Sequence, residues 1–382
     1  MTTKEILGED TTVLNSSATT VGVTIRGGHL GPVEFQVGAR RIAPMAVAPW
    51  AGEKLPRTTP PILQVLRGDF FCMPFGGNGT AVGTLKYPPH GETANARWKV
   101  ESDSTEQVLH ASLRLKAPGG RVDKFVRLVD GHAAVYQRHV VSGADGALPV
   151  GQHAMLKFPR EGMARLSLSP FVHGQVFPGE FEQAAQGGYS CLEPGGIFTS
   201  LSNVPRSDGG KADLTTYPAR EGYEDLVMMC SDASMPFAWT AATVASEGWV
   251  WIALKDPRVL RSTIFWISNG GRHYAPWNGR HRGVIGVEEV TANFHDGAAE
   301  SIRPNALTKQ GIPTAVTFDK RIPTTVNYIM AVGSIPKGFD IVRTVRALPK
   351  NRGIEVESAS GKKARIALDL DFLNGSGRQH SS

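Results

Sequence analysis

Cysteine is scarce in this chain: three cysteines are spread over 382 residues, at positions 72, 191 and 230. An odd number of widely spaced cysteines fits neither a disulfide framework nor a CxxC metal knuckle. None of His90, His153 and His273 has a partner at the HxH, HxxxH or HExxH spacing of a zinc site. The sequence therefore predicts no metal and no other cofactor, and a reducing compartment, the cytoplasm.

Long apolar runs and a signal peptide pattern are also missing. No run reaches membrane-spanning length, and residues 1–12 are polar and mixed in charge. The net charge of +6 and the pI near 9.2 would suit an acidic partner. However, Lys and Arg are scattered, without a nucleic-acid-binding motif. We therefore expect neither a membrane nor a nucleic-acid partner, while a local basic pocket for a phosphate or uronic acid stays open. The oligomeric state is unknown.

Helical patterns are few. The best candidate helix, residues 297–308, is interrupted by Pro304. The 43 glycines and 25 prolines mark many turns, and short segments rich in β-branched and aromatic residues lie between them. The clearest candidate strands are 21–26, 33–37, 96–101, 107–115, 122–129, 133–141, 148–158, 226–230, 237–244, 249–255, 262–268, 283–290, 315–318, 324–331 and 340–345. This pattern predicts an all-β sandwich or barrel and not a βαβ fold.

The chain has no internal repeat, low-complexity linker or break in composition that would separate two domains. We expect a single domain over residues 20–373. A loose arm rich in Thr and Ser is expected over residues 1–19, and a flexible tail over residues 374–382.

A candidate ligand-binding loop lies between two apolar strands in residues 265–290. The polar and aromatic side chains of this loop and of the strand after it are Arg272, His273, Tyr274, Trp277, Asn278, Arg280, Glu288 and Glu289. Aromatic faces, hydrogen-bond donors and a carboxylate base are what a sugar site requires. The alternative is an ordinary edge loop followed by a solvated acidic pair.

Three further stretches carry candidate site residues. Arg67 precedes an apolar run and a Gly-rich turn, where a buried structural role explains it as well as contact with a ligand does. His90 follows two prolines that stiffen its loop, and His153 interrupts a strand-like segment. Glu92, close to His90, leaves a two-carboxylate glycosidase arrangement open.

In chain order, these motifs resemble the aldose 1-epimerase (galactose mutarotase-like) superfamily over most of residues 21–346. The motifs are Arg67 with its Gly-rich turn, His90-Gly91 with Trp98, residues 149–153, and Ile285-Gly286-Val287-Glu288. Residues 67–76 are also similar to the glucose-6-phosphate 1-epimerase branch. The resemblance implies a large twisted antiparallel β-supersandwich with few short helices, and a sugar in the cleft of one concave sheet.

The resemblance also implies catalytic roles. Glu288 would be the general base that takes the proton of the anomeric hydroxyl. His153 would be the general acid that protonates the ring oxygen, so that the C1–O5 bond opens and recloses with inversion at C1. His90 would hydrogen-bond the sugar near its ring oxygen. The neighbouring Glu289 leaves the choice of base open.

Arg67 and Asp225 would contact sugar hydroxyls, and Trp277, Asn278, Arg272 and His273 complete the expected substrate-binding set. The predicted function is an isomerase that interconverts the α and β anomers of a free or phosphorylated sugar. One alternative is a non-catalytic carbohydrate-binding protein with the same fold. Another is a polysaccharide lyase that uses Tyr274, His273 and Arg272.

Overall fold

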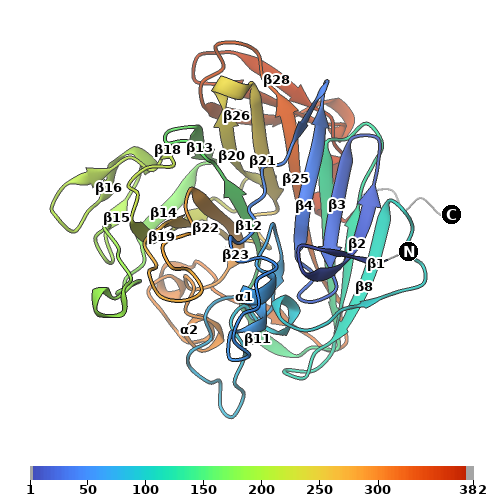
Figure 1. Ribbon diagram of the computed structural model, residues 1–382, viewed down its shortest axis with the longest axis vertical. Helices are drawn as coiled ribbons and strands as arrows, with labels where there is room; N and C mark the ends of the chain where they lie inside the picture. The colour runs from blue at the N-terminus through green and yellow to red at the C-terminus, as the bar shows by residue number, and fades with distance from the viewer. Residues whose placement is uncertain (1–2, 376–382) are drawn as a thin grey trace.

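The computed structural model describes residues 3–375, and nearly all of its regular structure is β-strand (Figure 1). In this range the α-helices are two single short turns, α1 (Pro61–Val65) and α2 (Ala298–Ile302). Helix α2 ends just before Pro304, within the segment predicted to be helical. The all-β prediction is confirmed. Residues 376–382 of the predicted tail lie outside the described residues, and the single domain stays a prediction.

Two large antiparallel sheets form the centre of the molecule. The nine-stranded sheet has the order β18 (Thr216–Tyr217), β13 (Ala164–Leu168), β20 (Ala238–Val244), β21 (Trp249–Lys255), β25 (Thr324–Ser334), β10 (Ala134–Ser142), β9 (Arg121–Arg127), β8 (Val108–Arg114) and β7 (Lys99–Val100). The seven-stranded sheet has the order β15 (Ile197–Phe198), β14 (Phe171–Val176), β19 (Tyr223–Ser231), β22 (Ser262–Asn269), β23 (Val284–Thr291), β12 (Val150–Lys157) and β6 (Phe71–Cys72). Most of the predicted strands fall on these elements.

Smaller sheets surround this pair. They are the five-stranded sheet of β1 (Thr3–Ile6), β2 (Glu9–Asn15), β3 (Thr19–Thr24), β4 (Leu30–Val37) and β5 (Arg40–Ile42), the three-stranded sheet of β26 (Val342–Ala347), β27 (Ile354–Ser358) and β28 (Lys363–Ile366), and the pairs β11 (Gly146–Leu148) with β24 (Val316–Phe318) and β16 (Val204–Pro205) with β17 (Lys211–Ala212). The three-stranded sheet packs on the nine-stranded sheet, because Val342, Ile354 and Ile366 share one buried cluster with Tyr136 and Ile252.

The prediction of a loose arm over residues 1–19 is wrong for the described residues 3–19. Residues 3–15 form two strands of the five-stranded sheet, and Thr11, Thr12 and Leu14 are buried. Their β-branched and aliphatic side chains supply an inward face, which the Thr- and Ser-rich composition concealed.

The seven-stranded sheet has two buried faces, which explains why its central strands read as nearly continuous apolar runs. Phe265 and Val287 belong to the cluster that includes residues of the nine-stranded sheet. Ile264 and Trp266 belong instead to a cluster on the other face, together with Phe70. Since successive side chains of a strand point to opposite faces, the position of each residue along the strand decides which face it serves.

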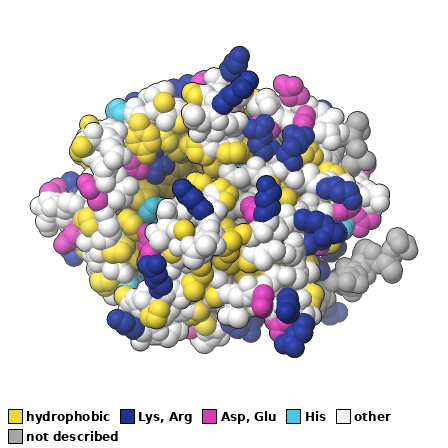
Figure 2. Space-filling model, turned by 90° about the horizontal axis from the view of Figure 1, so that it is seen from below, with side chains coloured by type: hydrophobic (Ala, Val, Ile, Leu, Met, Phe, Trp, Pro, Cys, Tyr) yellow, Lys and Arg dark blue, Asp and Glu magenta, His cyan; other side chains and the backbone are white. Residues whose placement is uncertain are grey.

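Among the described residues, no helix is long and apolar enough to cross a membrane. On the face shown in Figure 2, hydrophobic side chains gather around a hollow, and Lys and Arg are interspersed with acidic side chains.

Candidate active site

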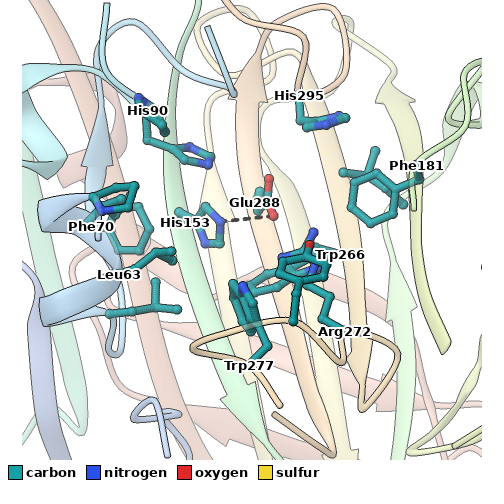
Figure 3. A pocket seen from close by; sticks show the side chains of 16 residues that line it. Leu63, Phe70, His90, His153, Phe181, Trp266, Arg272, Trp277, Glu288 and His295 are labelled. Carbon is teal, nitrogen blue, oxygen red and sulfur yellow. Dashed lines mark ion pairs between the residues drawn. The ribbon is translucent and has the colours of Figure 1, made fainter. Parts of the chain in front are cut away.

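A cavity of about 320 Å³ opens over the seven-stranded sheet, on the face that carries Trp266 (Figure 3). Its sixteen lining residues are Pro60, Ile62, Leu63, Leu66, Phe70, Pro89, His90, His153, Phe181, Leu226, Trp266, Arg272, Tyr274, Trp277, Glu288 and His295. The side chains come from the central strands, from the loop between β22 and β23, from the segments around α1 and His90, and from two further loops that carry Phe181 and His295. The volume is at the lower end of the range for small-molecule sites.

His153 and Glu288 form a buried pair in this cavity. They lie directly opposite each other on β12 and β23, and Nε2 of His153 is 3.2 Å from Oε1 of Glu288. The side chains are 5% and 3% exposed. The His153 ring stacks on Phe70, with the ring centroids 4.5 Å apart, and meets Trp266 edge-on. Strand register and aromatic packing therefore fix the imidazole against the carboxyl group.

Burial shifts the two groups in opposite directions, because a charge is poorly solvated there. It raises the pKa of Glu288 to about 8, against the opposing effect of Arg272. It lowers the pKa of His153 to about 3. Between these values the pair holds one proton and has no net charge. Two groups in contact that share one proton can together accept a proton at one atom and donate a different proton at the other.

His90 reaches the cavity from a loop with a demanding backbone. Its φ is +57°, and its backbone N–H donates to the carbonyl of Gly76. At Gly91, also left-handed, a Cβ would lie 1.9 Å from the carbonyl oxygen of Met73, so only glycine fits. Nδ1 of His90 is 3.5 Å from the thiol sulfur of Cys72, and its ring lies edge-on to that of His153. The loop thus holds His90 beside the pair.

Arg272 and three aromatic rings form another wall. The guanidinium carbon lies 4.7 Å from the ring centroid of Trp277, 5.3 Å from that of Trp266 and 5.5 Å from that of Phe181. Arg272 Nε donates to Oε1 of Glu182 at 2.6 Å. This cation is therefore stacked between rings and already has a carboxylate partner.

Glu289 points to the opposite face of β23. It accepts hydrogen bonds from the hydroxyls of Thr240 and Thr263, each at 2.6 Å, and pairs with the ammonium group of Lys255. Of the two adjacent carboxylates, Glu288 is therefore the one that lines the cavity.

Two predicted hydroxyl-binding residues are placed elsewhere. Arg67 is fully buried, and its guanidinium donates to the backbone carbonyls of Val65, Ile6 and Leu7. Asp225 accepts from the backbone N–H groups of Cys191 and Leu192. Both side chains therefore hold backbone segments together and do not line the cavity, so their predicted contact with sugar is corrected.

Only some of the substrate-binding residues predicted in the loop between β22 and β23 line the cavity. Trp277 and Arg272 line the cavity, whereas His273 and Asn278 are exposed and do not. The backbone of the loop turns at Asn278, whose φ is +46°, and its side chain is exposed. The substrate-binding roles predicted for His273 and Asn278 are corrected accordingly.

Several lining residues were not recognised from the sequence. The sequence pattern places Phe70 and Trp266 only in apolar segments. Trp266 is two positions from Ile264 in the same strand, so both side chains point to the same face. His295 and Phe181 come from loops without a strand pattern, and Nδ1 of His295 is buried without a hydrogen-bond partner. Strand alternation could have identified Trp266, but no local signal identifies His295 or Phe181.

Within residues 3–375, no cluster of three or more His, Cys, Asp or Glu side chains is arranged to hold a metal ion. The three cysteines in this range are buried and free.

Replacing Arg67 with Leu tests its structural role. The substitution removes the donors of the buried carbonyl of Val65 and of the part-buried carbonyls of Ile6 and Leu7, so we expect a loss of about 1–3 kcal/mol in the free energy of unfolding. Activity per folded molecule should not change. Chemical denaturation of this variant beside Arg57→Leu, a change at an exposed arginine, measures the difference. An unchanged stability together with weakened sugar binding would restore the ligand-facing role.

No family model matches the sequence, and no curated protein sequence is similar to it. The structure, however, has the galactose mutarotase-like fold, which confirms the resemblance at the level of the fold. A candidate aldose 1-epimerase from Escherichia coli aligns over 85% of this chain and 99% of its own, with 11% identity and a TM-score of 0.58. A candidate aldose 1-epimerase from Klebsiella pneumoniae covers 86% and 80%, with 13% identity and a TM-score of 0.58. A galactose mutarotase-related enzyme from Lactobacillus acidophilus covers 85% and 97%, with 12% identity and a TM-score of 0.54.

Proposed function

We propose that this protein is an aldose 1-epimerase-like isomerase that interconverts the α and β anomers of a free or phosphorylated sugar. The observation that carries the proposal is the contact between His153 and Glu288 in a cavity of monosaccharide size. The fold shared with candidate aldose 1-epimerases supports it. The cytoplasmic location stays a prediction.

The reaction needs two proton transfers at atoms bonded to the same carbon. At neutral pH the shared proton is on Glu288, and its transfer across the 3.2 Å contact to Nε2 of His153 gives the carboxylate and the protonated imidazole. Glu288 then takes the proton of the C1 hydroxyl while His153 donates its proton to the ring oxygen. The C1–O5 bond breaks, and C1 becomes an aldehyde carbon. After rotation about C1–C2, the O5 hydroxyl adds to the other face of the aldehyde and the two protons return. The pair holds one proton before and after each transfer, so the buried site never acquires a net charge.

His90 and the aromatic wall would position the sugar for these transfers. The half-buried ring of His90 lies 5.1 Å, centroid to centroid, from that of His153 and so faces the same reacting atoms. Trp266 and Trp277 line the cavity, and the ring surface that Arg272 leaves open would contact the apolar C–H groups of a pyranose. The chain supplies both proton-transfer groups itself.

The rate should depend on pH in an unusual way. The active pair holds one proton. Above the pKa of Glu288, about 8, the pair loses this proton, and below the pKa of His153, about 3, it binds a second proton. We expect kcat/KM to be flat from about pH 4 to pH 7 and to fall above pH 8. Stopped-flow polarimetry across this range, corrected for the spontaneous reaction, measures it. An acid limb near pH 6, as for an ordinary histidine, would contradict the assignment.

The activity itself is tested by polarimetry of freshly dissolved anomers across a panel of aldoses and hexose 6-phosphates. Faster equilibration of one sugar, in proportion to protein concentration, is the expected result. A flat result across the panel, with sugar binding measured by calorimetry, would refute the isomerase.

That second outcome defines the competing proposal, a non-catalytic carbohydrate-binding protein, which the stacking wall of Trp266, Trp277 and Phe181 favours. It requires an affinity for sugar that survives both His153→Gln and Glu288→Gln. The polysaccharide lyase is not proposed further. The three residues that a lyase would use, Tyr274, His273 and Arg272, do not act together in this cavity. His273 lies outside it, and the hydroxyl of Tyr274 donates to Glu182.

A further inference from the structure

We propose that the cavity selects an uncharged, hydroxyl-poor aldose, such as a deoxy sugar, over the parent hexose and over hexose phosphates. This inference rests on the proposed function and narrows its substrate class. It is carried by the side chains that line the cavity and by the contacts of its arginine.

The lining is mostly apolar. Ten of the sixteen lining residues are Pro, Ile, Leu, Phe or Trp. The other six are Arg272, Tyr274, Glu288 and the histidines at 90, 153 and 295. Among the described residues, no Asn, Gln, Ser, Thr, Asp or Lys side chain lines it. Such a cavity offers few partners to hydroxyl groups and broad surfaces to C–H groups.

Some of the remaining polar groups are committed to one another, whereas Nδ1 of His295 and Oε2 of Glu288 have no hydrogen-bond partner. His153 and Glu288 make the reacting pair, and Nδ1 of His90 contacts the thiol of Cys72. The hydroxyl of Tyr274 donates to Oε2 of Glu182 at 3.1 Å. A hexose carries a hydroxyl on nearly every carbon, and each hydroxyl loses its water partners when it is buried. A hexose hydroxyl that faces the apolar part of the lining would therefore enter this cavity without a partner.

Arg272 is the only Lys or Arg in the described lining, and its charge is already compensated. Glu182 accepts its Nε–H at 2.6 Å, and a carboxylate oxygen of Glu224 lies 3.9 Å from the same nitrogen. Side-chain exposures are 16% for Arg272, 4% for Glu182 and 0% for Glu224. A phosphate group bound to the guanidinium would lie close to these two acidic neighbours. Both acidic contacts are made at Nε, and they compensate the charge of the guanidinium and so weaken its attraction for an anion.

Removing a hydroxyl that has no partner should improve binding. A methyl or methylene group in its place would contact rings such as those of Trp266, Trp277 and Phe181. For each hydroxyl that faces these rings we expect about a tenfold lower Kd, which corresponds to about 1.4 kcal/mol.

The experiment compares glucose, 2-deoxyglucose, 6-deoxyglucose and glucose 6-phosphate, and the corresponding galactose series, by calorimetry and by polarimetry. We expect at least one deoxy sugar to bind about tenfold more tightly than its parent hexose, and the phosphates to bind most weakly. Equal or tighter binding of the parent hexose or of its phosphate would overturn the inference, and so would no binding by any probe. Selective binding without interconversion would refute the isomerase and leave the selectivity standing. Interconversion that favours a hexose phosphate would support the isomerase and overturn the selectivity.

Glu182→Gln tests the role of the arginine directly. The change removes the carboxylate that compensates Arg272, so we expect about a tenfold gain in affinity for glucose 6-phosphate and no gain for 6-deoxyglucose. Glu180→Gln, at an exposed glutamate two residues away, is the matched control and should alter neither affinity. An unchanged affinity for the phosphate in a folded Glu182→Gln variant would show that this carboxylate does not exclude anions. The wild-type panel decides the selectivity even if the variant does not fold.

Discussion

Glu288→Gln is expected to lower the rate of anomer interconversion by about 10²–10⁴-fold, the usual contribution of a proton-transferring group. Gln has nearly the same shape as Glu but cannot accept the proton of the C1 hydroxyl. Because the carboxyl is buried and its pKa is raised to about 8, the neutral amide should be tolerated by the fold. Polarimetry at neutral pH, with folding checked by circular dichroism and sugar binding by calorimetry, measures the effect.

The adjacent residue supplies the control for this prediction. Glu289 is next in β23 but points away from the cavity toward Lys255. Glu289→Gln should change stability and leave the rate per folded molecule nearly unaltered. The assignment of Glu288 as the base would be wrong if Glu289→Gln, and not Glu288→Gln, removed the activity.

Lys255→Met is expected to destabilise the protein by about 3–5 kcal/mol, because it leaves the buried Glu289 without its ion-pair partner. The side chains of the pair are 2% and 1% exposed. The ammonium group also donates to the carbonyl oxygen of Ser262 at 2.6 Å and to the hydroxyl of Thr263 at 3.0 Å. Denaturant unfolding followed by tryptophan fluorescence measures the free energy of unfolding.

A double variant separates the lost pair from lost packing. Lys255→Met combined with Glu289→Gln leaves no unpaired charge, so we expect it to recover much of the stability lost in the single variant. If the double variant were as unstable as the sum of the two single changes, the ion pair would not explain the effect.

The sequence allowed the fold class to be predicted, because its signals are local and repeated. β-Branched and aromatic segments separated by Gly and Pro recur along the chain, and β21, β22 and β23 were expected close to where they lie. The N-terminal arm was missed, because the residues that cover its inward face are distant in the sequence. Arg67, for example, donates to the carbonyls of Ile6 and Leu7, about sixty residues earlier.

The candidate site was predicted in part, for a similar reason. His90, His153 and Glu288 line one cavity. Their grouping could be predicted from the order of several motifs along the chain, because no single motif shows which distant segments lie together. Asp225 is predicted to contact sugar hydroxyls, but its carboxylate accepts hydrogen bonds from the backbone N–H groups of Cys191 and Leu192. The compensation of Arg272 by Glu182 joins residues ninety positions apart. Only the folded chain shows that this basic residue is not a free cation.

The most direct test of the central claim is two-dimensional exchange NMR on an aldose at anomeric equilibrium, with and without the protein. The claim that His153 and Glu288 open the sugar ring predicts exchange peaks between the α and β C1 protons. Their intensity should grow with protein concentration and be lost with His153→Gln. Sugar signals that broaden on binding, without any exchange peak across the aldose and deoxy-aldose panel, would contradict it.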